Sequence, residues 1–138
     1  HEFLINGLLA LNVNTAGQAA ELVKRVDEPN YGYLYDTFHF NIEENSIVDV
    51  IPQTISRITH VHISENNRST PGAGHIDFAP VFKALKAAGY DGWMTVEAFG
   101  SALPDLAAAT KIWRPLFARP EDVYEGGYRL MRQGWDAA

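Results

Sequence analysis

The stretch Ile58-Thr59-His60-Val61-His62-Ile63 predicts a β-strand, because polar and apolar side chains alternate along it. Successive side chains of a strand point to opposite faces of the sheet. His60 and His62 are therefore expected on one face, with Val61 and Ile63 on the other. The strand presents both histidines to the same side of the sheet.

Two more strands are expected, one on each side of this stretch in the sequence. The aromatic run 31–35 follows Pro29-Asn30 and predicts a buried strand that ends at Asp36. The run 93–97 predicts a strand that ends at Glu97. Between and around the strands, the apolar spacing predicts helices over 15–27, 43–55, 77–88, 104–117 and 120–132, with a long polar loop over 64–74.

Several of these helices carry recognisable start and stop signals. Thr15 stands three residues before Gln18, the spacing of a capping box. Gly89 suits the left-handed position after a helix end, and Pro52 implies that the helix over 43–55 bends or stops early. The alternation of helices and strands, joined by right-handed crossovers, predicts a parallel α/β fold.

The chain has 138 residues, which makes one domain over 1–138. A closed eight-stranded barrel typically needs about 250 residues, and the sequence offers only three or four strands. We therefore expect about half of a barrel. A small open α/β sheet, or a dimer in which another chain completes the structure, are the alternatives.

Composition narrows the classes of partner. The hydrophobic content is 46% and the charged content 20%, as in globular proteins, and the formal net charge is -6 without a basic cluster. We therefore expect no electrostatic binding to nucleic acid or to a membrane surface, and we expect a small molecule or a protein as the partner. The absence of cysteine favours a cytoplasmic location and leaves carboxylates and imidazoles as metal ligands.

Three predicted strands end in residues that can bind a metal: Asp36, His62 and Glu97. In parallel α/β folds the ligand site lies beyond the carboxyl ends of the strands. Taken singly, these residues have structural alternatives: a helix N-cap, a hydrogen-bonded core histidine and half of a buried ion pair. Together they favour a metal site, because burying such groups without partners is costly. Two carboxylates and one imidazole suit Mn²⁺, Co²⁺ or Mg²⁺, and Zn²⁺ is less favoured.

Two further polar residues follow the first two strand ends closely. His39 lies three residues after Asp36, and Arg68 lies six after His62 in the polar loop. We expect both to reach a bound polyol. The alternatives are a loop-capping histidine and a solvated arginine.

The strings Tyr35-Asp36-Thr37-Phe38-His39-Phe40-Asn41-Ile42-Glu43-Glu44 and His60-Val61-His62-Ile63-Ser64-Glu65-Asn66-Asn67-Arg68, followed by Pro71-Gly72, are distinctive. They resemble the D-tagatose 3-epimerase family. This family includes the D-psicose (allulose) and L-ribulose 3-epimerases and belongs to the xylose-isomerase-like (β/α)₈ TIM barrels. The resemblance runs from about Asn14 to the C-terminus and implies that the chain supplies the C-terminal half of a barrel.

The resemblance also implies roles for individual residues. Asp36, His62 and Glu97 would be metal ligands, most often of Mn²⁺, and His39 and Arg68 would contact the sugar. The remaining ligand of the family is a glutamate from an earlier strand, for which Glu2 is the candidate, while Leu9 stands where the family has a second glutamate that contacts substrate.

The activity that the resemblance implies is inversion of C3 of a free ketose, such as D-tagatose, D-fructose or D-psicose, or L-ribulose. Glu97 and Glu2 would withdraw and return the C3 proton on opposite faces of an enediolate. The family is commonly dimeric or tetrameric, so a homodimer or homotetramer is expected. Trp113 and Phe99 would either line the site or pack in the core.

Two other functions stay open at the level of sequence. One is another sugar isomerase of the same barrel type, acting as an aldose-ketose isomerase, a hydroxypyruvate isomerase or an inosose dehydratase. The other is a non-catalytic fragment that binds a metal or a sugar. The irregular start of the chain, over residues 1–13, is the main support for this second alternative.

Overall fold

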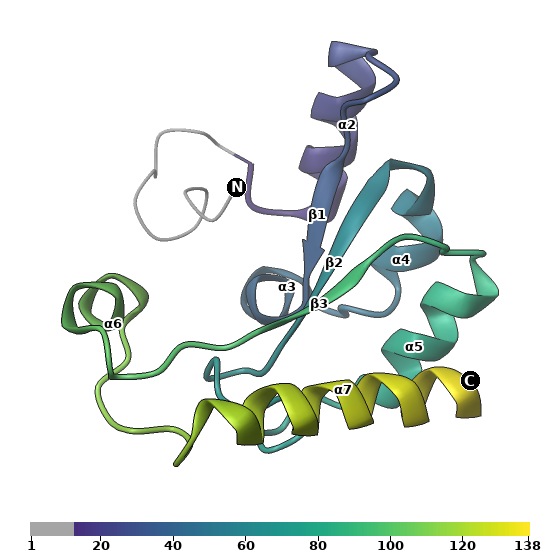
Figure 1. The fold of residues 1–138 in the computed structure, drawn as a ribbon. Coiled ribbons are helices and arrows are strands. Elements are labelled where there is room, and N and C mark those ends of the chain that lie inside the picture. The colour runs from purple at the N-terminus through teal and green to yellow at the C-terminus, as the bar shows by residue number, and fades with distance from the viewer. Residues whose placement is uncertain (1–12) are drawn as a thin grey trace.

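The computed structural model describes residues 13–138, which contain a three-stranded parallel sheet (Figure 1). Its strands are β1 (Tyr33–Asp36), β2 (Ile58–Ser64) and β3 (Met94–Glu97), in the order β1-β2-β3. Helices connect the strands, so the predicted parallel α/β arrangement is confirmed. Three parallel strands correspond to part of a barrel, as the length of the chain predicts.

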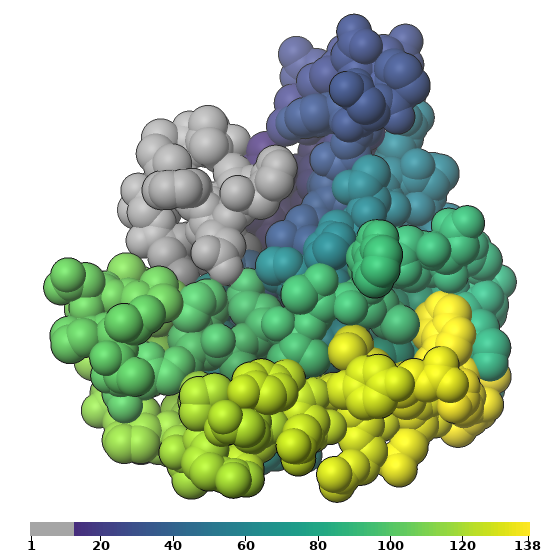
Figure 2. Space-filling model, viewed as in Figure 1, coloured from purple at the N-terminus to yellow at the C-terminus, as the bar shows by residue number. Residues whose placement is uncertain are grey.

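Helices α2 and α7 contact β1 and β3, respectively, and α4 and α5 lie between them, whereas α6 lies apart, beyond the end of β3 (Figures 1 and 2). Among the described residues, no helix is long and apolar enough to cross a membrane. The helices are α2 (Ala16–Val26), α3 (Thr37–Glu43), α4 (Val50–Thr54), a 3₁₀ helix (Ile55–Arg57), α5 (Phe78–Ala87), α6 (Pro104–Thr110) and α7 (Pro120–Ala137).

The core lies between the helices and one face of the sheet. Tyr35, Val61 and Ile63 are completely buried there, together with side chains of α5 such as Phe82 and Leu85. The opposite face carries the alternate residues of each strand, including both histidines of β2. The predicted alternation along 58–63 is thus confirmed.

Strand register places the chemically active residues side by side. Asp36 pairs with His62 across β1 and β2, and Ser64 pairs with Glu97 across β2 and β3. Because the strands are parallel, their carboxyl ends lie at the same edge of the sheet. This edge therefore holds the predicted site residues Asp36, His62 and Glu97.

The predicted start of α2 and end of α5 are confirmed. The Thr15 side chain accepts a hydrogen bond from the Gln18 backbone N–H, and the Gln18 side chain accepts from the Thr15 backbone N–H in return. At the end of α5, Gly89 has φ of +75°, a conformation that glycine adopts without steric cost.

Three predicted helices are wrong in their extent, and the one expected over 120–132 continues to Ala137 as α7. The helix expected over 43–55 is replaced by α3 and α4, because Asp36 caps a helix that begins immediately after β1. Pro52 does not break α4, since it occupies the first turn, where a missing N–H leaves no hydrogen bond unmade. The helix expected over 104–117 ends at Thr110, because Lys111 turns into the left-handed conformation with φ of +62°.

Candidate active site

Three of the predicted ligands converge at the carboxyl edge of the sheet. Asp36, His62 and Glu97 each offer one ligand atom, and these atoms all lie within 4.8 Å of one another. His62 Nδ1 lies 2.9 Å from Glu97 Oε2 and 3.3 Å from Asp36 Oδ2. One nitrogen therefore faces two carboxylates.

Asp36 uses its two oxygens for different purposes. Oδ1 caps α3 by accepting hydrogen bonds from the backbone N–H groups of Phe38, at 2.9 Å, and His39, at 3.2 Å. Oδ2 is buried and faces His62 Nδ1 at 3.3 Å, which is the separation of an ion pair. The N-cap alternative for Asp36 is therefore correct for one oxygen, while the other is directed at the cluster.

The two carboxylates control the charge of His62. Hydrogen bonding to Asp36 and then to Glu97 raises the pKa of His62 to about 9, although partial burial of the ring opposes the shift. Protonated His62 can donate from Nδ1 to Glu97. The neighbouring His60 ring lies edge-on to His62 and forms a 2.8 Å hydrogen bond with Thr95, and its pKa is lowered by burial and by His62.

The donor set fits a divalent metal ion with oxygen and nitrogen ligands. Asp36 and Glu97 are almost completely buried, and one oxygen of each lies within 3.3 Å of His62 Nδ1. Burying two carboxylates beside one another is costly unless a positive charge lies between them. In the metal-free protein the His62 proton supplies that charge, and a divalent ion would replace it.

Arg68 lies beside this cluster and is 2% exposed, so the alternative of a solvated arginine is wrong. Its guanidinium carbon is 4.0 Å from the centroid of the Phe38 ring and 5.0 Å from that of Phe99. Nη2 donates to His39 Nε2 at 3.2 Å, and Nε lies 3.7 Å from Glu97 Oε1. The structure thus brings His39 and Arg68 together next to Glu97.

The other residues that the sequence analysis singled out do not belong to the described cluster. Glu2 and Leu9 lie outside the described residues 13–138. Trp113 is 80% exposed, so it does not pack in the core of this chain. Phe38 was not predicted as a site residue, although its position between Asp36 and His39 in one motif was the available signal.

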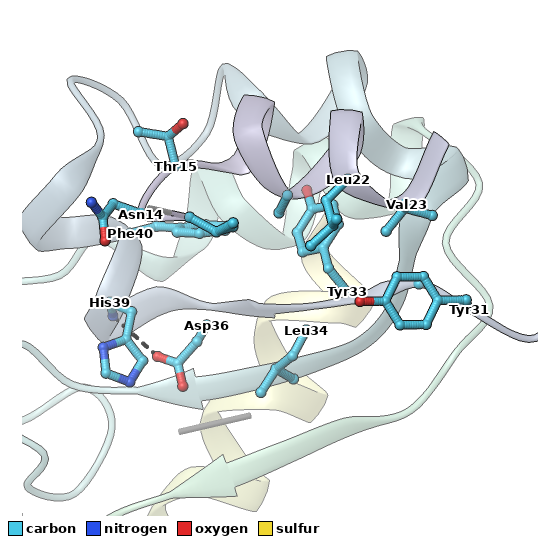
Figure 3. A pocket seen from close by; sticks show the side chains of 13 residues that line it. Asn14, Thr15, Leu22, Val23, Tyr31, Tyr33, Leu34, Asp36, His39 and Phe40 are labelled. Carbon is cyan, nitrogen blue, oxygen red and sulfur yellow. Dashed lines mark hydrogen bonds between the residues drawn. The ribbon is translucent and has the colours of Figure 1, made fainter. Parts of the chain in front are cut away.

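A pocket beside the cluster follows β1 and α2 (Figure 3). Asp36 and His39 lie at one end of it, whereas Leu22, Val23 and Tyr31 lie at the other. The groups of this pocket that can bind a metal ion or sugar hydroxyl groups, Asp36 and His39, lie at the end next to the cluster, and the far end is apolar. The polar cluster at the strand ends is therefore the candidate active site.

Comparisons with known proteins agree with this geometry. Residues 5–133 match the family described as the xylose isomerase-like TIM barrel. The chain is 33% identical over 129 residues to the probable ketose 3-epimerase of Synechocystis sp., covering 94% of this chain and 45% of that protein. It is 40% identical over 113 residues to the ketose 3-epimerase of Arthrobacter globiformis, covering 80% of this chain and 39% of that protein.

The fold is also similar to that of a solved L-ribulose 3-epimerase. The TM-score is 0.85 at 33% identity, over 91% of this chain and 43% of that one. The chain thus spans less than half the length of the relatives it matches. Its sequence match, its parallel strands and its cluster of polar residues at their carboxyl ends lead to one assignment. The chain belongs to the xylose isomerase-like TIM barrel family.

Proposed function

We propose that this chain supplies the metal-binding, C-terminal part of a ketose 3-epimerase. The observation that carries the proposal is the convergence of Asp36, His62 and Glu97 beside the buried pair His39 and Arg68. Relatives named ketose 3-epimerase, L-ribulose 3-epimerase and D-psicose 3-epimerase support the class of reaction. The proposed substrate is a free ketose.

The reaction requires removal of the proton on C3, next to the C2 carbonyl. As a base, Glu97 takes this proton, the C–H electrons form a C2–C3 double bond, and negative charge moves to the C2 oxygen. A divalent ion, with Mn²⁺ as the proposed identity, would be held by Asp36, His62 and Glu97 and would supply positive charge beside the developing enediolate. A second carboxylate, proposed to be Glu2, returns a proton to the opposite face of C3.

Arg68 and His39 are proposed to bind and orient the sugar. The guanidinium presents several N–H donors in a fixed plane, held between two aromatic rings. Its hydrogen bond to His39 places both side chains on the same side of the cluster. Together they would align C3 with Glu97, because a small displacement of the reacting carbon lowers the rate strongly.

The test is exchange of the C3 proton. D-fructose and D-tagatose are incubated in D₂O with the purified chain and Mn²⁺, the ion is removed by chelation, and proton NMR is recorded. Deuterium at C3 together with the C3 epimer is the expected result. Glu97→Gln should abolish exchange without unfolding the protein, and Glu43→Gln on the exposed end of α3 is the matched control. Normal exchange in Glu97→Gln refutes the proposed base.

The same spectra separate the related isomerases. An aldose product would indicate aldose-ketose isomerisation, and turnover of hydroxypyruvate or of an inosose would indicate the other two reactions. The C3 epimer alone supports the epimerase.

A non-catalytic metal-binding or sugar-binding part is the second candidate. The described cluster supplies Asp36, His62 and Glu97, whereas inversion at C3 needs a further carboxylate. Metal binding without any C3 exchange would select this candidate.

Self-association forms part of the proposal, as a homodimer or homotetramer. In the described sheet β1 and β3 each pair with β2 alone, so each has one edge without a strand partner. Such edges favour pairing with another chain. Light scattering coupled to size-exclusion chromatography would measure the mass, and a monomer over the micromolar range contradicts self-association.

A further inference from the structure

Glu65 is a completely buried carboxylate in the loop that follows β2, and it lies outside the metal-binding cluster. Its Oε1 accepts hydrogen bonds from the backbone N–H groups of Asn66 and Ile76, each at 3.0 Å. Its Oε2 accepts from the backbone N–H of Gly72 at 2.9 Å. Three N–H groups of one loop therefore converge on a single side chain.

The loop over 65–76 is built around this carboxylate. A buried carboxylate is tolerated when charge-assisted hydrogen bonds replace its water, and Glu65 has three such bonds. A Cβ atom added to Gly74 would lie 2.5 Å from Glu65 Cδ, which is closer than non-bonded carbon atoms approach. The side chain of Glu65 therefore occupies space that the loop leaves for it by having glycine at position 74.

The same loop fixes the backbone of Arg68. Arg68 has φ of +61°, a left-handed conformation that is unfavourable for a residue with a Cβ atom. The Arg68 N–H donates to the Glu65 carbonyl at 2.9 Å, and the Arg68 carbonyl accepts from the Phe99 N–H at 2.9 Å. Such a conformation persists only where surrounding contacts impose it, and two of these contacts are made by the backbones of Glu65 and Phe99.

We propose that Glu65 is a positioning residue for Arg68. By closing the loop over 65–76, its carboxylate holds Arg68 in the left-handed turn from which the guanidinium reaches between Phe38 and Phe99 to His39. Glu65 itself neither binds the metal nor exchanges a proton with the sugar. The inference rests on the proposed function only in one respect, that Arg68 binds the sugar.

The test replaces Glu65 by glutamine in the full chain. The amide has the same shape, but its NH₂ group faces a backbone N–H where the carboxylate has an acceptor. We expect the Arg68 Nε–H signal in ¹⁵N NMR to move toward its solvent-exposed position and to exchange with water at least about tenfold faster. In a D-fructose titration the dissociation constant should rise about tenfold, whereas Mn²⁺ affinity should stay within about twofold of the wild type.

Glu44→Gln is the matched control, because Glu44, at the C-cap of α3, also accepts a backbone N–H, that of Ala16 in α2 at 2.7 Å, and this hydrogen bond does not involve the loop over 65–76. This variant should leave the Arg68 signal and the sugar affinity unchanged. Gly74→Ala is the second test, since its Cβ atom would lie 2.5 Å from Glu65 Cδ and Cγ and closer still to Asn66 Oδ1, and it should shift both readouts in the same direction. Gly74→Ala replaces Glu65→Gln as the test variant if Glu65→Gln does not fold.

The outcomes separate this inference from the proposed function. A wild-type Arg68 signal in folded Glu65→Gln or Gly74→Ala overturns the inference, even if the Gly72 and Ile76 amides exchange faster. If the wild-type chain binds no D-fructose, the sugar-binding role of Arg68 fails, and the Arg68 signal alone decides whether Glu65 positions it. Loss of Mn²⁺ affinity in Glu65→Gln would contradict a role confined to Arg68.

Discussion

Binding of Mn²⁺ to this chain should release close to one proton at pH 7, and that proton should come from His62. The Nδ1 atom of His62 lies 2.9 Å from Glu97 Oε2 and 3.3 Å from Asp36 Oδ2. Because Nδ1 is the ring nitrogen that faces both carboxylates, we expect it to be the atom of His62 that binds the metal. A proton and a metal ion therefore compete for the same nitrogen.

The magnitude follows from the raised pKa. With a pKa of about 9, His62 in the metal-free protein is roughly 99% protonated at pH 7. An ordinary histidine with a pKa of about 6.5 would be only about one quarter protonated. Metal binding should therefore release about 1 proton rather than about 0.25, and the apparent affinity should rise about tenfold for each pH unit between 7 and 8.5.

Calorimetric titration with Mn²⁺ in buffers of different ionisation enthalpy measures the released protons directly. His75→Gln is the matched control, because His75 is exposed and lies outside the cluster. Release of about a quarter of a proton by the wild type, or an affinity that is flat between pH 7 and 8.5, would refute the argument.

The stability of the metal-free chain should show the opposite trend with pH. The folded pKa of His62 is raised, so its ion pairs contribute fully below pH 6.5 and are lost as the pH rises through about 9. Thermal unfolding followed by circular dichroism should therefore give a falling midpoint over this range. A midpoint that rises instead would mean that the carboxylates do not hold a protonated His62.

Three other predictions concern single residues. Arg68→Ala should weaken D-fructose binding with metal content unchanged, because Arg68 contacts Glu97 without being a ligand, and loss of bound metal would contradict this. Thr15→Ala should lower the free energy of unfolding by about 1 kcal/mol in urea titrations, since it removes the N-cap of α2, and an unchanged midpoint would count against the capping box. Burial raises the pKa of Tyr33 to about 12, so stability should fall as the pH rises from 10 to 12, and Tyr33→Phe should reduce this slope.

The strands and the site residues could be predicted from the sequence because their signals are local. Alternation along 58–63 identifies β2 and its two faces, and parallel topology then places Asp36, His62 and Glu97 at one edge. The capping box at Thr15 likewise involves residues only three positions apart. Each of these inferences requires the backbone of one element and a rule for how elements connect.

The properties that the sequence did not predict depend on contacts between distant segments. Arg68 is a charged residue in a polar loop, and only Phe38 and Phe99 from two other segments explain its burial. Helix α3 begins at Thr37, earlier than the apolar spacing suggests, because Asp36 caps it, and α4 covers only Val50–Thr54 of the range 43–55. In these cases a long-range contact or a cap outweighed the helical periodicity on which the prediction was based.

Each residue of the candidate site is held in place by contacts close to it. Asp36 is fixed by the N-cap of α3, Arg68 by its loop, and His62 and Glu97 by the pairing of three adjacent strands. The N-cap, the loop contacts and the strand pairing involve no strand other than β1, β2 and β3. Metal binding and turnover are therefore separable: this chain has the contacts that we expect to bind the ion, whereas inversion at C3 also needs a second carboxylate on the opposite face of the sugar.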